Sequence, residues 1–135
     1  MIPQDSTLKI ALHQFMVCED FSTLSDDGYV AKGIRSNLYV PSFPFRFPNL
    51  FVVTCWRKDE RFHKEVIEYA FEDEPSVRTP HMDIEPITNQ VLFRWHTHRI
   101  PREVVIPREG ILKIRVILDW KVLFESYLLV EKRPG

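Results

Sequence analysis

The sequence has few glycines and few cysteines, and it has no excess of charge of either sign. It contains no Gly-x-Ser-x-Gly motif and no glycine-rich phosphate-binding loop among its four glycines, so nucleophilic catalysis has no candidate residue. Eighteen Lys and Arg balance nineteen Asp and Glu, which gives a formal net charge of -1. Without a basic excess, the chain lacks the electrostatic attraction that favours binding to nucleic acids or anionic membranes.

Long hydrophobic runs are also absent. The segment MIPQDSTLKIALHQFMV has no basic n-region, and Lys9, His13 and Gln14 interrupt its apolar residues, so it does not resemble a signal peptide. No stretch approaches the roughly 20 apolar residues of a membrane span. We therefore expect a cytoplasmic protein in which Cys18 and Cys55 are reduced and buried, although a disulfide between them stays open. Two cysteines alone cannot form a structural zinc site.

Aromatic residues and prolines are plentiful by contrast. Aromatics make up 13% of the chain and there are ten prolines, which favours strands and turns over helices. Alternating residues predict a half-buried strand over 28–40 with a bulge at Gly33. The segment 49–58 is apolar on both faces, as in a central strand. The segment 63–71 fits a strand better than a helix because it is rich in β-branched and aromatic residues.

A β-hairpin near the C-terminus is the clearest local prediction. A turn near Trp120 and Lys121 joins two segments with apolar residues on one face, Leu112, Ile114, Val116 and Leu118 in the first and Val122, Phe124, Leu128 and Val130 in the second. The segment 72–90 carries three prolines and five acidic residues, which predicts a long surface connection with a short extended piece around 82–84.

These segments together predict the fold class. About eight strands separated by turns favour an all-β protein, an antiparallel β-sandwich that forms a single domain over residues 1–135. A closed barrel is the second possibility. Residues 131–135 are expected to be a flexible tail.

The stretch HTHRIPREVVIPREG raises the question of a metal site. His96 and His98 lie two residues apart, so on a strand they project from one face and can bind one ion. Glu103 and Gly110 continue the spacing of the first cupin motif. Gln90 stands where that motif opens with glycine, however, and no histidine follows Gly110 to complete the second motif.

The neighbours of the two histidines also argue against a metal. In this segment Val91, Phe93 and Trp95 form an apolar face, and the polar face comprises Arg94, His96 and His98. A guanidinium group is an unfavourable neighbour for a metal ligand, because both positive charges would lie close together. We therefore expect solvated or hydrogen-bonded histidines and no metal or cofactor, with His96, His98 and Glu103 as the alternative ligand set.

Two groups of aromatic residues are candidate binding surfaces. Phe43, Phe45 and Phe47 alternate with prolines, and they form either a row of rings for a partner or sugar, or a plug at one end of the core. Trp120 at the hairpin tip would be an exposed apolar residue that a protein partner covers.

An acidic stretch, CEDFSTLSDDG, contains enough carboxylates to suggest a calcium loop. It lacks the spacing of the common twelve-residue loop, and a polar turn that ends in Asp27-Gly28 explains it more simply. The carboxylates concerned are Glu19, Asp20, Asp26 and Asp27.

The segments GYVAKGIRSNLYVPSFPFRFPNLFVV and VVIPREGILKIRVILDWKVLFESYLLV together resemble a family of short bacterial proteins of unassigned function. The resemblance spans residues 10–130, and the motifs of the family fall on Gly28, Gly33, Phe47-Pro48, 50–53, Pro107, Gly110 and Asp119. The chain departs from the family at Trp120, where the family has glycine, and over 72–90. The resemblance implies an immunoglobulin-like or C2-like sandwich without known catalytic residues.

We therefore expect a non-enzymatic protein that binds a protein partner or a second copy of itself, through the phenylalanine row or the surface around Trp120. A metal-dependent enzyme of cupin-like chemistry that uses the His-x-His pair is the alternative. A carbohydrate-binding module that uses the phenylalanine row is the third hypothesis.

Overall fold

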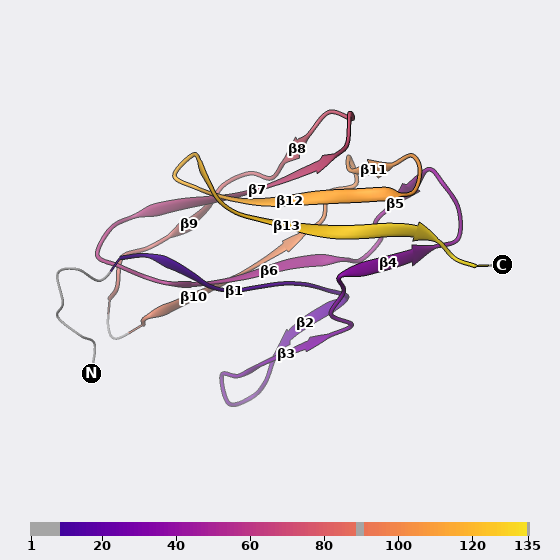
Figure 1. The fold of residues 1–135 in the computed structure, drawn as a ribbon. Helices are drawn as coiled ribbons and strands as arrows, with labels where there is room; N and C mark the ends of the chain where they lie inside the picture. The colour runs from indigo at the N-terminus through magenta and orange to yellow at the C-terminus, as the bar shows by residue number, and fades with distance from the viewer. Residues whose placement is uncertain (1–8, 89–90, 135) are drawn as a thin grey trace.

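The computed structural model of the protein describes residues 9–88 and 91–134, and every regular element in these ranges is a β-strand (Figure 1). The prediction of an all-β fold is confirmed, and none of the described residues forms a helix that could cross a membrane. The long strands are β1 (Ala11–Cys18), β6 (Phe51–Arg57), β7 (His63–Phe71), β10 (Phe93–Arg99), β12 (Gly110–Leu118) and β13 (Lys121–Lys132). The short strands are β2 (Asp20–Thr23), β3 (Tyr29–Lys32), β4 (Asn37–Val40), β5 (Phe45–Arg46), β8 (Val77–Arg78), β9 (Met82–Ile84) and β11 (Val105–Ile106). These thirteen strands exceed the predicted eight because strands of two to four residues are too short to show an alternating pattern.

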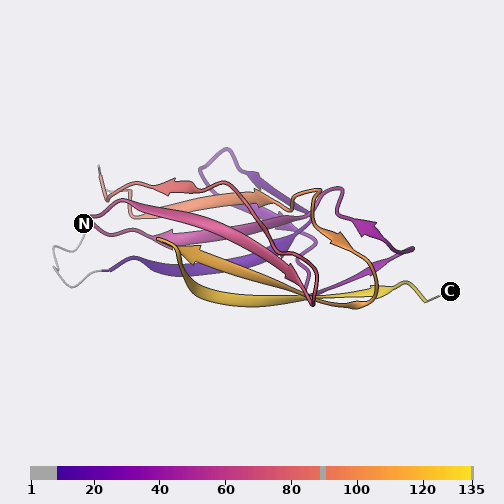
Figure 2. The same cartoon turned by 90° about the horizontal axis from the view of Figure 1, so that it is seen from above.

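Two sheets lie face to face, as the views in Figures 1 and 2 show. The three-stranded sheet has the order β1-β6-β10, and the larger sheet has the order β4-β13-β12-β7-β8, with β9 also paired to β7. Two small pairs, β2 with β3 and β5 with β11, complete the described strands. The named strand pairs are antiparallel except that of β4 with β13, which run parallel.

The hydrophobic core fills the space between the two sheets. It is built from alternate positions of the facing strands, because successive side chains on a strand point to opposite sides. These buried side chains include Val52 and Trp56 of β6, Ile67, Tyr69 and Phe71 of β7, and Leu112, Ile114 and Val116 of β12.

Strand β6 is covered on its other face as well, as predicted for 49–58. Val53 and Cys55 alternate with the core residues, yet they are 0% and 1% exposed. The β2–β3 hairpin lies over this face (Figure 1), where the rings of Phe21 and Tyr29 pack on Trp95, the neighbour of Cys55 on β10. A strand covered on both faces has to be apolar on both faces, which accounts for its sequence.

The segment 28–40, predicted as one strand, is two strands that belong to different sheets. β3 pairs with β2, whereas β4 pairs with β13. Gly33 lies between them with a φ of 63°, a left-handed conformation that most residues rarely adopt. The predicted bulge at Gly33 is therefore a point where the chain passes from one sheet to another.

The other local predictions are largely confirmed. The segment 63–71 is strand β7, and the predicted hairpin is formed by β12 and β13. The connection after β7 contains β8 and, at 82–84, β9, while residues 89–90 of this segment lie outside the described residues. The predicted tail is wrong for residues 131–132, which pair with β4, and Gly135 lies outside the described residues.

Gly110, the first residue of β12, lies against a buried ring. A Cβ atom at this position would come within 2.7 Å of Cζ of Phe71, which is 3% exposed. We expect Gly110→Ala to lower the free energy of unfolding by about 1 to 3 kcal/mol, because the core cannot move freely to admit the methyl group. Urea denaturation measures this loss, and Gly28→Ala, in an exposed turn, is the control with a smaller expected effect. An unchanged stability of Gly110→Ala would show that Phe71 is free to move.

Candidate functional site

The two histidines of the His-x-His pair point into the molecule. His96 and His98 of β10 lie opposite Thr54 and Val52 of β6, on the face of that sheet that is turned toward the core. His96 is 5% and His98 is 3% exposed, whereas Phe93 on the alternate face is 39% exposed. The polar face of β10 is therefore its buried face, the reverse of the usual relation between polarity and exposure.

Glu65 of β7 is the partner of both histidines. Its Oε1 atom lies 2.7 Å from Nδ1 of His96 and 2.6 Å from Nε2 of His98. Its Oε2 atom accepts a hydrogen bond from the indole N–H of Trp56 at 2.5 Å. Glu65 is completely buried, and its three partners belong to the opposite sheet. These hydrogen bonds therefore link the two sheets through the core, and of the two expected states, solvated or hydrogen-bonded, the histidines are in the second.

The contacts determine which groups of this cluster carry protons. Burial alone would raise the pKa of Glu65, but the hydrogen bonds with His96 and His98 lower it to about 2. Nε of Arg94 donates to Nε2 of His96 at 3.3 Å, so the ring of His96 carries its proton on Nδ1, toward Glu65. Glu65 is thus an ionised carboxylate that accepts hydrogen bonds from three N–H groups.

Two buried hydroxyl groups in the same region have no hydrogen-bond partner among the described residues. One is Oγ1 of Thr54, the residue opposite His96, and the other is the phenol oxygen of Tyr69, which follows Glu65 by four positions on β7. Burial and the charge of Glu65 raise the pKa of Tyr69. Leaving a buried polar group unsatisfied costs about 1 to 3 kcal/mol, so these hydroxyls mark positions where water or a ligand would be stabilised.

The cluster is also a potential set of metal ligands. Glu65, His96 and His98 each offer one ligand atom within 4.8 Å of the others, the one group of this kind found in residues 9–88 and 91–134. Two imidazoles and a carboxylate bind zinc and several other transition metals in proteins. Glu103, the third ligand of the alternative hypothesis, is exposed and borders an open groove beside Glu74. The third potential metal ligand in the structure is therefore Glu65 and not Glu103.

Sequence reasoning missed Glu65, although the alternation of β7 contains the signal. Glu65 shares a strand face with Ile67, Tyr69 and Phe71, all of which are in the core. A carboxylate in line with core residues indicates a buried polar partner, because an unpaired buried charge is unstable. The sequence does not reveal which residues of the facing sheet supply that partner.

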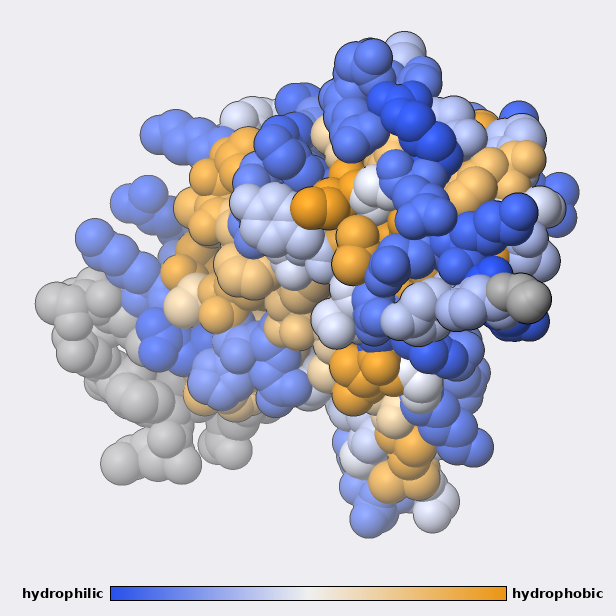
Figure 3. All heavy atoms as spheres, turned by 45° about the vertical axis from the view of Figure 1, so that its right-hand side comes forward, coloured by the Kyte–Doolittle hydropathy of each residue, from blue (hydrophilic) through white to orange (hydrophobic). Residues whose placement is uncertain are grey.

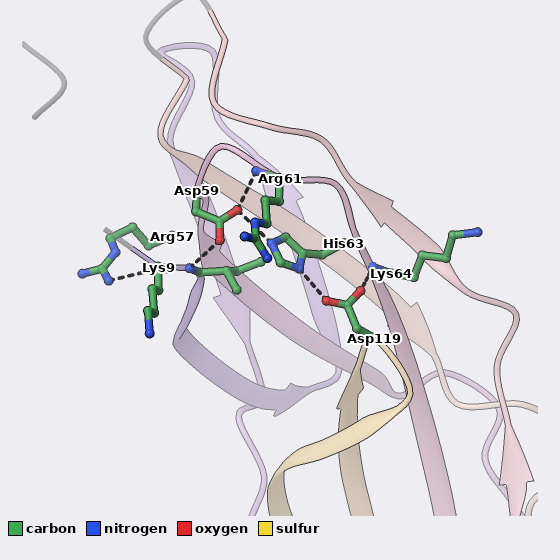
Figure 4. A network of polar contacts seen from close by, with 8 residues as sticks. Lys9, Arg57, Asp59, Arg61, His63, Lys64 and Asp119 are labelled. Carbon is green, nitrogen blue, oxygen red and sulfur yellow. Dashed lines mark hydrogen bonds and ion pairs between the residues drawn. The ribbon is translucent and has the colours of Figure 1, made fainter. Parts of the chain in front are cut away.

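A second histidine cluster lies at one end of the molecule (Figure 4). Nε2 of His63 is 2.8 Å from Oδ1 of Asp59, and Nδ1 is 2.5 Å from Oδ2 of Asp119. Burial alone would lower the pKa of His63, but the hydrogen bonds to the two carboxylates raise it. Asp119 also accepts the backbone N–H of Lys64, and Asp59 accepts that of Arg61. The cluster ties the β12–β13 turn to the loop between β6 and β7.

The structure separates the two predicted aromatic surfaces. Phe47 is 2% exposed in the core, and Phe43 and Phe45 are half-buried against it. Of the two interpretations of these rings, a binding row or a plug at one end of the core, their burial favours the plug. Phe47 offers no free ring face for a sugar. Trp120 is 64% exposed at the turn, as expected for a hairpin tip, and both Asp119 and Trp120 have positive φ angles, of 50° and 69°.

Exposed apolar side chains continue from the turn into β13. We define the hairpin patch as the four side chains Trp120, Val122, Leu123 and Phe124, which are 64%, 54%, 54% and 39% exposed. The ring of Phe124 contacts that of Phe15 on β1, with 5.0 Å between the ring centroids. In Figures 1 and 2, β1 and β13 lie along the same side of the molecule. Both sheets therefore present an edge strand on this side.

The outer edge of β13 is free over most of its length. β4 pairs with residues 129–132 alone, so residues 121–128 pair with β12 on one side and have no strand on the other side among the described residues. The pairing with β12 shifts between Val116 and Ile117, and Leu123 has no counterpart on β12 at this bulge. Unpaired N–H and C=O groups of an edge can form hydrogen bonds with another strand.

Two of the four acidic candidates form local contacts, and both cysteines are buried. Glu19 forms an ion pair with Arg35 at 3.0 Å, and Asp26 accepts the backbone N–H of Gly28 in the turn between β2 and β3. Cys18 and Cys55 are both unpaired and buried. Burial raises the pKa of both thiols, that of Cys55 to about 11, so they are protonated at neutral pH.

No protein-family model and no curated protein matches the sequence. A function therefore has to be inferred from the chemistry and the exposure of the residues themselves.

Proposed function

We propose that the protein is a non-enzymatic association module, in which two copies of the chain pair through the hairpin patch and the free edge of β13. The observation that carries this proposal is that four exposed apolar side chains, one in the turn and three in β13, lie beside the unpaired stretch of that strand. An exposed apolar edge favours pairing with another strand, because this forms backbone hydrogen bonds and buries apolar surface together. In Figure 3, apolar side chains form continuous areas between charged ones on the face in view.

The proposal also covers the type of fold, the family and the cellular compartment. Two facing sheets with an apolar core are the arrangement of a β-sandwich, of the immunoglobulin-like or C2-like type that the resemblance implies. We propose that the chain belongs to the family of short bacterial proteins that it resembles, and that it acts in the cytoplasm. A non-enzymatic role is supported by the burial of Glu65, His96 and His98, which leaves their polar groups away from any substrate in solvent.

The charges of β13 favour an antiparallel pair of identical strands. When two copies pair antiparallel about Leu123, Lys121 of each copy lies opposite Glu125 of the other, and Val122 lies opposite Phe124. Opposite charges in directly facing positions stabilise a strand pair, as do facing apolar side chains. A two-fold axis through this point lets the backbone N–H and C=O groups of both edges form hydrogen bonds with each other. Closed dimers with such an axis are the most common oligomers among proteins.

We expect Leu123→Lys to abolish the dimer, because it places two positive charges at the centre of the pair. Trp120→Ala should weaken association by about tenfold or more, since aromatic residues contribute strongly to interfaces, and it should leave folding intact. Light scattering on a sizing column measures the mass of each variant over a range of concentrations. Circular dichroism checks that each variant remains folded.

The matched control for these substitutions is Ile34→Lys. Ile34 is 65% exposed between β3 and β4, so it is an apolar side chain as accessible as Trp120 but outside the hairpin patch. This variant should dimerise like the original protein. A monomer at every concentration in the unchanged protein would overturn the proposal, and so would a dimer that persists in Leu123→Lys.

A further inference from the structure

We infer that Glu65, His96 and His98 form a binding site for one divalent transition-metal ion of the zinc type, located in the core between the two sheets. The ligand atoms come from two strands that face each other, β7 and β10, so an ion at this point would cross-link the sheets. This inference is independent of the proposed association, because the three ligands are buried in the core whereas the side chains of the hairpin patch are exposed.

The spacing of the ligand atoms is close to what such an ion requires. Bonds from zinc to imidazole nitrogen and carboxylate oxygen are about 2.0 to 2.2 Å long, which separates the ligands of a tetrahedral ion by roughly 3.4 Å. Oε1 of Glu65 is now 2.6 Å and 2.7 Å from the two ring nitrogens. Each separation has to increase by less than about 1 Å, which small rotations of the side chains supply.

The indole of Trp56 orients the carboxylate for this task. Its N–H group bonds Oε2 of Glu65, which fixes the plane of the carboxylate and leaves Oε1 directed at the two histidines. Metal-binding carboxylates and imidazoles are typically held in this way by hydrogen bonds to a second group of residues. Trp56 is itself 0% exposed, so this contact is fixed by packing.

The unpaired hydroxyl of Thr54 supplies a partner for a fourth ligand. Oγ1 of Thr54, the residue opposite His96, is buried without a hydrogen-bond partner among the described residues. Three protein ligands leave one position of a tetrahedral ion to water. A water molecule bound there needs a hydrogen-bond partner in a core that is otherwise apolar, and this hydroxyl provides one.

Charge also favours an ion at this point. Glu65 is a buried carboxylate, and among the described residues it forms no ion pair with a lysine or arginine. A divalent cation would compensate this charge directly. Each imidazole has to lose the proton that it directs at Glu65, and His96 then carries its proton on Nε2, so the exposed side chain of Arg94 has to turn away from it.

The test begins with untagged protein that is stripped of metal with a chelator and then equilibrated with zinc chloride or cobalt chloride. We expect one ion per chain after gel filtration, measured by plasma mass spectrometry, and a visible cobalt absorption typical of low coordination number. Glu65→Gln and His98→Gln should weaken zinc binding by more than about 100-fold, and Trp56→Phe, which removes an orienting contact but no ligand, by about 10- to 100-fold.

The control variant is His81→Gln, which removes an exposed histidine near Asp83 and should bind zinc like the original protein. Absence of zinc binding by the original protein would overturn the inference, as would equal zinc content in Glu65→Gln. If a ligand variant fails to fold, the stoichiometry and cobalt spectrum of the original protein and of Trp56→Phe decide the matter. Leu123→Lys should retain its metal whether or not it dimerises, which separates this inference from the proposed function.

Discussion

Replacing Glu65 with alanine is expected to lower the free energy of unfolding by about 3 to 5 kcal/mol, because removing one member of a buried ionic group leaves its partners unpaired. The N–H groups of Trp56, His96 and His98 would then face an apolar core without an acceptor. Since a domain of this kind is stable by only about 5 to 15 kcal/mol, the loss is a large part of the total. Urea denaturation in the presence of a chelator measures it without any contribution from bound metal.

Two controls separate the lost hydrogen bonds from the lost side chain. Glu103→Ala removes an exposed glutamate and should change stability by less than about 0.5 kcal/mol. A triple variant with Glu65→Met, His96→Leu and His98→Leu removes the acceptor together with two of its three donors and leaves only the indole N–H of Trp56 unpaired, so it should recover part of the stability that Glu65→Ala loses. A loss below about 1 kcal/mol in Glu65→Ala would contradict the assigned network.

Replacing His63 with glutamine is expected to destabilise the protein in a way that depends on pH. The loss should be about 2 to 4 kcal/mol near pH 5.5, where His63 is charged between Asp59 and Asp119. The folded-state pKa of His63 is raised, so its contribution is complete below the unfolded value of about 6.5 and disappears as the pH rises through the folded-state pKa. The difference between the two proteins should therefore shrink toward about pH 9.

The protonation of Asp59 sets the lowest pH at which its ion pair with His63 contributes to stability. Burial alone would raise its pKa, but hydrogen bonds from the backbone of Arg61 and from His63 lower it. Its contribution is present above the unfolded value of about 3.9 and is lost as the pH falls through the lowered folded-state pKa. Urea denaturation of both proteins at several pH values tests this, with His81→Gln as the control. A difference that stays constant from acid to alkaline pH would contradict the charged state of His63.

The sequence predicts the elements whose pattern is local. The β12–β13 hairpin and the central strand β6 follow from alternation or its absence, since each depends on burial within a few residues. The break at Gly33 is not predicted. One continuous strand shows the same alternation of residues as two short strands that are joined by a single left-handed residue. The parallel pairing of β4 with β13 is also not predicted, since it joins residues 37–40 to 129–132 and no local pattern reports it.

The candidate site shows the same limit. The pair His96 and His98 is visible as a motif, but the only third ligand that the motif spacing offers is Glu103, in the alternative hypothesis of a metal site. The actual partner, Glu65, is 31 positions before His96 and belongs to the opposite sheet. The alternation of β10 was also informative only in part, because its polar side chains are the ones that face the core. These histidines are stabilised there by one carboxylate of the facing strand, Glu65, which no single segment can indicate.

The place of β13 in the larger sheet has a consequence for how the protein is made. β13 is synthesised after the other twelve strands, yet it lies between β4 and β12 and supplies the inward-facing Leu128 and Val130. While the ribosome still holds this segment, β4 has no partner in the sheet and one side of the core is open to solvent. This sheet is therefore complete only after β13 has left the exit tunnel, and until then the nascent chain exposes apolar core residues that favour aggregation.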